Sequence, residues 1–229
     1  MIFLYRFPLV LLGAMFNKRL TLIIVFTMFI YSLSPHKEFR FLSQILPIVF
    51  VIEAHGIDWC LRRIRSMKFR WLLIVACFGH LFIGIYFSTM DRQGQISVMD
   101  YLRKTLPSKS DSPLLIDFLM PCHSTPFHNF IHRPDVQLNF LTCEPNLNRS
   151  MTHYLDEADE FYLNPIENLR KRFSKSQASH LVMFNTLYDQ LKPIFDTELP
   201  FDVKKILFNS HIQHTSRHGR MIYVLQRRS

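Results

Sequence analysis

The lengths of the hydrophobic stretches divide the chain into two parts. In residues 1–90, long apolar stretches alternate with short charged segments: Leu20–Pro35 and Trp71–Met90 contain no charged residue, and Phe41–Trp59 is interrupted only by Glu53 and Asp58. A bilayer core is crossed by roughly 20 apolar residues, so each of these stretches is long enough to be a membrane-spanning helix or nearly so. The pattern predicts a membrane α-helical first half.

Ile2–Phe16 is a fourth, weaker candidate because Arg6 lies within it. A signal peptide is the alternative interpretation, but no basic region precedes the apolar run and no small-x-small cleavage site follows it. We therefore expect about four spans in residues 1–90, and the first of them can be shorter than a full span.

After residue 90 the apolar runs become short, which is typical of a water-soluble domain. Ile96–Leu106 has helical spacing, and so do the segments 166–173 and 188–195, where Pro193 is expected to bend or end the helix. Five further runs suit strands: 112–120, 136–143, 180–187, 203–211 and 221–228. Strands that alternate with helices predict a small α/β domain over residues 91–229.

The charge distribution orients this arrangement in a membrane. The net charge of +9 is made up of +7 in residues 1–90 and +2 in residues 91–229. The basic residues of the first half gather at Lys18-Arg19 and at Arg62–Arg70, which is the pattern of cytoplasmic loops. Residues 32–40 and the α/β domain are then expected on the opposite, non-cytoplasmic side. No basic face interleaved with aromatic residues is evident, so we expect no nucleic-acid partner.

Two motif-like segments in the second half have ordinary structural interpretations. Asp156-Glu157-Ala158-Asp159 has the letters of a helicase Walker-B box, but the chain has no Gly-rich phosphate loop ending in Gly-Lys-Ser/Thr. We interpret it as a helix start or an acidic loop. The cluster Cys122, His123, His128 and His132 fits no familiar zinc spacing, and we predict no metal site there.

Cysteine positions suggest a covalent link in the domain. Cys122 and Cys143 each end one of two successive predicted strands, and they form a disulfide if the non-cytoplasmic compartment is oxidising. Asn148-Arg149-Ser150 is a glycosylation acceptor sequence on the same side, so Asn148 is a candidate glycosylation site.

The segment between the second and third predicted spans holds His36, Lys37, Glu38 and Arg40. Lys and Arg donate charge-assisted hydrogen bonds to a phosphate, and His can donate or relay a proton at neutral pH. One interpretation is therefore a binding site for a lipid-linked phosphate at the non-cytoplasmic mouth of a helical hairpin. The other is a set of helix-end charges that anchor the spans at the interface, and the residues alone favour this second interpretation slightly.

Resemblance to a known family changes that balance. HKEFRF, residues 36–41, resembles the His-Lys-Glu-x-Arg-Phe signature of glycosyltransferase family 22, the multi-span mannosyltransferases of the endoplasmic reticulum. MPCHSTPF (120–127) and HYLDEADEFYLNP (153–165) are similar to the luminal tail of the branch that acts in glycosylphosphatidylinositol (GPI) anchor assembly. The similarity runs from about Leu20 to the C-terminus.

The resemblance implies a partial membrane glycosyltransferase bundle of the GT-C type followed by a luminal α/β domain, in the endoplasmic reticulum membrane. It implies transfer of mannose from dolichyl-phosphate mannose to a GPI-anchor precursor, as the third mannose in an α-1,2 bond, without a cofactor. His36, Lys37, Glu38 and Arg40 would then be substrate-binding.

In the family the acidic residues suspected as catalytic base lie in a first luminal loop that this chain lacks, so the catalytic residue is unknown. We expect the chain to correspond to the C-terminal part of such an enzyme. The alternative is a non-catalytic, membrane-anchored luminal module or truncated paralogue that binds a partner or a lipid-linked glycan.

Overall fold

The computed structural model describes residues 6–33, 39–107, 114–144, 154–175, 177–213 and 215–228, with only the backbone of Phe39, Arg40 and Lys175. Within these residues the chain forms two compact units, Met1–Leu81 and Phe82–Ser229, and each is described by itself. The division falls within one long helix, a few residues before the boundary predicted at residue 90.

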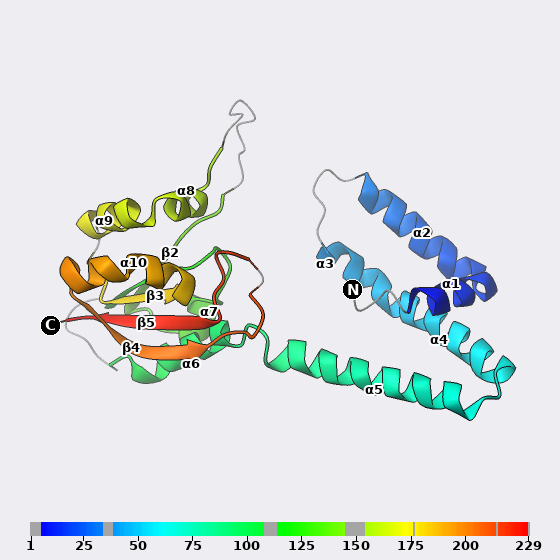
Figure 1. The fold of residues 1–229 in the computed structure, drawn as a ribbon. Helices are drawn as coiled ribbons and strands as arrows, with labels where there is room; N and C mark the ends of the chain where they lie inside the picture. The colour runs from blue at the N-terminus through cyan, green and yellow to red at the C-terminus, as the bar shows by residue number, and fades with distance from the viewer. Residues whose placement is uncertain are drawn as a thin grey trace. The chain divides into compact units, whose positions relative to one another are not determined.

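The first unit is helical (Figure 1). Its elements are α1 (Phe7–Phe16), α2 (Lys18–Ser32), α3 (Phe39–Leu42), the 3-10 turn η1 (Ser43–Ile45), α4 (Leu46–Arg63) and the start of α5 (Met67–Thr89). Two helical stretches, Ser43–Arg63 and Met67–Thr105, are long and apolar enough to cross a membrane by length and composition. The spans predicted at Leu20–Pro35 and Ile2–Phe16 correspond to α2 and α1, which have 15 and 10 residues.

Two glycines set how closely α1 and α4 pack. A Cβ atom on Gly13 of α1 would lie 1.8 Å from the carbonyl oxygen of Ile52, and one on Gly56 of α4 would lie 2.1 Å from that of Leu9. Any side chain at either position would therefore overlap the facing backbone. Small residues at a helix crossing are the usual means of close packing between apolar helices in membranes.

The second unit is an α/β domain with a five-stranded sheet. Its elements are the end of α5, then α6 (Gly94–Thr105), β1 (Leu114–Leu119), α7 (His128–Ile131), β2 (Val136–Phe140), α8 (Glu157–Leu163), α9 (Pro165–Lys175), β3 (His180–Phe184), α10 (Asn185–Thr197), β4 (Phe201–Phe208) and β5 (Met221–Arg227). All five predicted strands are present at their predicted places. Pro193 lies inside α10 and, contrary to one expectation, does not end that helix.

The strand order is β2-β1-β3-β5-β4. Strands β1, β2 and β3 are parallel, whereas β5 runs antiparallel to both β3 and β4. Because β2 and β3 flank β1 on opposite sides, the chain reverses its winding direction at β1. The carboxyl ends of β1 and β3 therefore meet at a topological switch point, where open α/β sheets commonly bind ligands.

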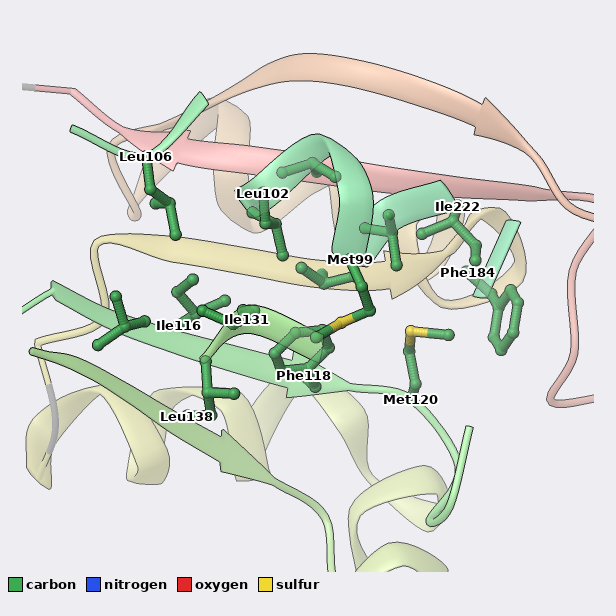
Figure 2. Close-up of a cluster of buried hydrophobic side chains, with 14 residues drawn as sticks. Met99, Leu102, Leu106, Ile116, Phe118, Met120, Ile131, Leu138, Phe184 and Ile222 are labelled. Atoms are coloured by element: carbon green, nitrogen blue, oxygen red, sulfur yellow. The ribbon is translucent and has the colours of Figure 1, made fainter. Parts of the chain in front are cut away.

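Helices cover both faces of the sheet and make two hydrophobic cores. On one face Val98, Met99 and Leu102 of α6 pack against side chains of the sheet such as Ile116 and Phe118, as Figure 2 shows for part of this cluster. On the other face α8, α9 and α10 cover the second set of inward-facing residues. Residues alternate between the two faces along each strand, as period-2 geometry requires.

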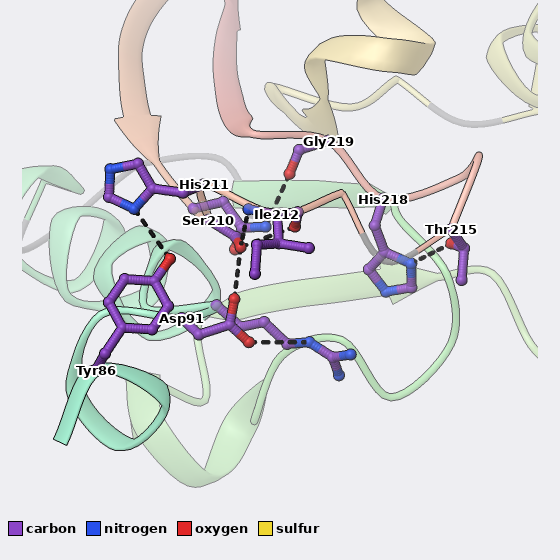
Figure 3. A network of polar contacts seen from close by, with 10 residues as sticks. Tyr86, Asp91, Ser210, His211, Ile212, Thr215, His218 and Gly219 are labelled. Carbon is purple, nitrogen blue, oxygen red and sulfur yellow. Dashed lines mark hydrogen bonds and ion pairs between the residues drawn. The ribbon is translucent and has the colours of Figure 1, made fainter. Parts of the chain in front are cut away.

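Polar contacts hold the end of α5 against the loop that follows β4 (Figure 3). The Ser210 hydroxyl donates to the Asp91 carboxylate at 2.5 Å, and Tyr86 Oη lies 3.0 Å from His211 Nδ1. Asn209 is buried in the same loop and donates to the carbonyl of Gly219 at 2.8 Å. The carboxyl end of α5 is therefore part of the α/β domain.

Candidate functional site

The charged cluster that the sequence singled out lies largely outside the described residues. His36, Lys37 and Glu38 are not among them, and for Arg40 the structure gives only a helical backbone position in α3. Asn148 also lies outside. The phosphate-binding role of the cluster and the glycan at Asn148 therefore stay predictions.

The helical unit contains a largely apolar hollow with one ion pair at its wall. The hollow has a volume of about 660 Å³, and its lining includes Leu9, Ile57 and Leu72 as well as Arg6 and Glu53. The guanidinium of Arg6 forms an ion pair with the carboxylate of Glu53, whose side chain is only 5% exposed. An apolar hollow of this size can accommodate part of a lipid chain.

Arg6 and Glu53 entered the sequence interpretation only as residues that interrupt predicted spans. Their pairing was missed because 47 positions separate them. The guanidinium of Arg6 also lies 5.3 Å from the centre of the Phe50 ring. Ionisable side chains within apolar helices are costly unless they are paired, so the presence of a basic and an acidic residue in two different predicted spans was the available signal.

In the α/β domain a buried carboxylate lies in the central strand. Asp117 of β1 is 1% exposed and accepts a hydrogen bond from Arg172 Nε of α9 at 2.7 Å. Its second oxygen, Oδ1, has no hydrogen-bond partner among the described residues. Burial raises the pKa of Asp117 above its usual range, and the hydrogen bond and charge of Arg172 offset this only partly.

Arg172 connects this strand to its neighbours. Its Nη1 donates to Glu157 Oε1 at 2.6 Å, and its Nη2 donates to the carbonyl of Phe140 at 3.4 Å. Burial on its own would raise the pKa of Glu157, but hydrogen bonds from Thr142 and Arg172 outweigh it, so the pKa lies below its usual range. One guanidinium thus ties β1, β2 and α8 together.

The Asp156–Asp159 segment has structural roles that agree with its interpretation as a helix start. Asp156 is the N-cap of α8 and accepts a hydrogen bond from the backbone N–H of Asp159 at 2.6 Å. Asp159 pairs with Arg217 at 2.7 Å. These carboxylates are occupied in holding α8, which leaves the Walker-B resemblance without support.

The loop after β1 is fixed covalently. Cys122 and Cys143 form the predicted disulfide, which joins the segments that follow β1 and β2. These two sulphurs and a ring nitrogen of His123 are the group of potential metal ligands found among the described residues. Disulfide sulphurs are not thiolates, so neither a zinc site nor a Cys-His nucleophile is available in this state.

The same loop has an unusual backbone. His123 and Phe127 have positive φ values of 59° and 43°. The Phe127 ring stacks on Phe140 with centroids 4.6 Å apart, and the Thr125 hydroxyl is buried without a partner among the described residues. Strained backbone persists only where surrounding contacts hold it, and here aromatic packing and the disulfide provide those contacts.

Comparison with known proteins gives one consistent result. The sequence profile of the Alg9-like mannosyltransferase family matches residues 1–132. The chain is 32% identical over 210 residues to the human protein "GPI alpha-1,2-mannosyltransferase 3", a match that covers 90% of this chain and 36% of the relative. No solved structure shows significant similarity.

Two other relatives match the chain with similar identity and coverage. The mouse protein of the same name is 33% identical over 212 residues, covering 91% of this chain and 38% of the relative. "GPI mannosyltransferase 3" of Yarrowia lipolytica is 32% identical over 225 residues, and this match covers 89% of this chain and 42% of the relative. The chain thus spans somewhat more than a third of the length of the curated relatives it matches.

Proposed function

Because the chain belongs to the Alg9-like mannosyltransferase family, we propose that it is part of an enzyme that adds an α-1,2-linked mannose to a GPI precursor. The observation that carries this proposal is the similarity over 90% of the chain to the human relative named above. That similarity includes both the helical unit and the α/β domain, so it is not confined to a module shared by many proteins.

We further propose dolichyl-phosphate mannose as donor and the endoplasmic reticulum membrane as location, with the α/β domain in the lumen. The apolar hollow in the helical unit supports a lipid-linked substrate, and the disulfide supports an oxidising compartment. The basic loops at Lys18-Arg19 and Arg62–Arg70 support the orientation.

The chemistry of this transfer follows from the donor. The acceptor hydroxyl oxygen attacks the anomeric carbon, the bond from that carbon to the phosphate oxygen breaks, and the configuration inverts. A carboxylate base takes the hydroxyl proton, and basic groups stabilise the negative charge that develops on the departing phosphate. We assign the phosphate contact to His36, Lys37 and Arg40, with Glu38 orienting either Lys37 or Arg40.

Complementation tests the proposal. Cells that lack the third GPI mannose should regain surface GPI-anchored proteins when they express this chain or a form of it extended upstream. Mass spectrometry of the accumulated GPI precursors should show one additional hexose. Failure of both forms, at normal protein level and membrane location, would favour the non-catalytic module instead.

A further inference from the structure

A second hollow lies in the α/β domain, away from the switch point. It has a volume of about 700 Å³, and its lining comes from the end of α6, from the amino-terminal ends of β1, β2 and β3, and from β4 and β5. This volume falls within the range of small-ligand sites in proteins.

The ionised side chains that line the pocket are all basic. They are Lys204, Arg227 and Arg228, and no carboxylate is among the lining residues. Arg228 is balanced by Asp202, whose Oδ1 lies 2.8 Å from its Nε. Within the described part of the chain, Arg227 donates to the neutral Oε1 of Gln177, at 3.3 Å, and neither Arg227 nor Lys204 forms an ion pair. Among the described residues, Lys204 and Arg227 thus lack an acidic partner, which favours an anionic ligand.

The position of Lys204 depends on an irregularity in the sheet. The register between β4 and β5 shifts between Val203 and Lys205, so Lys204 has no partner residue in the ladder. Such bulges redirect a side chain and occur often beside binding sites. Lys205, the next residue, pairs with Val224 and does not line the pocket.

The remaining polar lining suits a ligand with many hydroxyl groups. Gln137, Gln177 and Gln226 each bring an amide that can donate and accept hydrogen bonds, and Ser179 adds a hydroxyl. The ring of Tyr101 provides an apolar surface at the wall. The guanidinium of Arg227 and the ammonium group of Lys204 can donate to a phosphate, and the glutamine amides can bind sugar hydroxyls. Together these groups match a sugar that carries a phosphate.

We propose that this pocket binds a phosphorylated glycan. The proposal rests on the function proposed above, because a GPI precursor joins a mannose-containing glycan to phosphate, and it makes the α/β domain a second recognition site for the acceptor. Lys204 and Arg227 contact the phosphate, and the glutamine amides contact sugar hydroxyls.

Direct binding to the full chain in detergent tests this. Mannose 6-phosphate is the probe, and mannose and inorganic phosphate are tested separately for comparison. Isothermal titration calorimetry or saturation-transfer NMR measures the affinity of each ligand. We expect mannose 6-phosphate to bind at least about tenfold more tightly than either mannose or inorganic phosphate, since it alone uses both sets of contacts. Equal affinity for inorganic phosphate would overturn the glycan part of the proposal, and no binding would overturn all of it.

Substitutions place the ligand in this pocket. Lys204→Ala is expected to weaken binding of mannose 6-phosphate about tenfold or more, and Arg227→Lys to weaken it because the guanidinium is lost while the charge stays. Lys205→Ala is the matched control and should bind like the wild type. Equal effects of Lys204→Ala and Lys205→Ala would place the ligand elsewhere. Because binding needs no catalysis, failure here with successful complementation would reject the pocket and leave the enzyme proposal standing.

Discussion

Arg172 Nε of α9 and Asp117 Oδ2 of β1 lie 2.7 Å apart in the middle of the α/β domain, although 55 positions separate them in the chain. Their contact joins a helix to the central strand of the sheet, and the same guanidinium reaches Glu157. A carboxylate that is 1% exposed depends on this single cation, so the pair is a sensitive point of the fold.

Arg172→Ala should destabilise the domain by about 3 kcal/mol, because it leaves the Asp117 carboxylate buried without a partner. Hydrogen exchange of the peptide that contains β1, measured in the full chain, should accelerate roughly a hundredfold. Arg170→Ala is the control on the same helix, because its pair with Glu198 is solvent-exposed, and it should not change exchange. Asp117→Leu combined with Arg172→Met should recover most of the lost stability, because no charge is then left buried at this place. Equal exchange rates of the β1 peptide in Arg172→Ala and Arg170→Ala would contradict the prediction.

The disulfide should be found by peptide mapping without reduction, with Cys122 linked to Cys143. Cys122→Ser should lower the free energy of unfolding of the domain by about 3 kcal/mol, because the bond closes a loop of 21 residues in the unfolded chain. Cys77→Ser, at an exposed free cysteine, should have no such effect. Free alkylation of both Cys122 and Cys143 in the native protein would remove the disulfide and its stabilisation.

Membrane orientation follows from the basic loops and can be measured with glycosylation reporters. A reporter after Ser229 should be modified, because the α/β domain is expected in the lumen. One inserted within Arg62–Arg70 should stay unmodified, because that loop is expected in the cytoplasm. The reverse pattern would reject the orientation and the luminal position of the domain.

Arg40→Lys and Lys37→Ala test the proposed donor-phosphate contact. A charge-assisted hydrogen bond to phosphate is worth about 1.5–3 kcal/mol, so each change should slow mannosyl transfer on the order of ten- to a hundredfold. Interface anchoring predicts a different result. Arg40→Lys keeps the positive charge, so it should leave the rate of mannosyl transfer unchanged. Donor-dependent transfer in membranes, at equal protein level, separates these outcomes, and wild-type rates for both variants would return the cluster to an anchoring role.

Stability of the α/β domain should fall on mild acidification because of His180. Burial lowers the pKa of this side chain in the folded domain below its usual value near 6.5. The unfolded chain then binds a proton more readily, so stability is complete above the unfolded pKa and is lost as pH falls from there toward the folded pKa.

Thermal unfolding at pH 7.5 and 5.5 measures the effect of His180. The wild type should unfold at a lower temperature at pH 5.5, and His180→Gln should show a smaller difference between the two pH values. His128→Gln, at an exposed position, serves as control and should behave like the wild type. An unchanged difference in His180→Gln would assign the pH dependence to other groups.

Local pattern was sufficient for most elements of this fold. Short apolar runs located all five strands, since strands buried on both faces, such as β1 and β3, are almost continuously apolar, and the apolar lengths located α4 and α5. Cys122 and Cys143 could be suggested as a pair from the sequence because they end two successive predicted strands, and the structure joins them across the neighbouring strands β1 and β2. Asp156 acts as N-cap of α8, which agrees with the interpretation of its segment as a helix start.

Strand order and the contacts across the sheet were decided only by the tertiary structure. No local feature of β5 places it between β3 and β4 in antiparallel direction, because pairing depends on how two cores are buried at once. The same holds for Arg172 with Asp117 and for Arg6 with Glu53, whose partners are distant in sequence. The sequence determines which side chains need a partner, since an unpaired buried charge is unfavourable anywhere in the molecule, and the packing of helices and strands determines which partner is within reach.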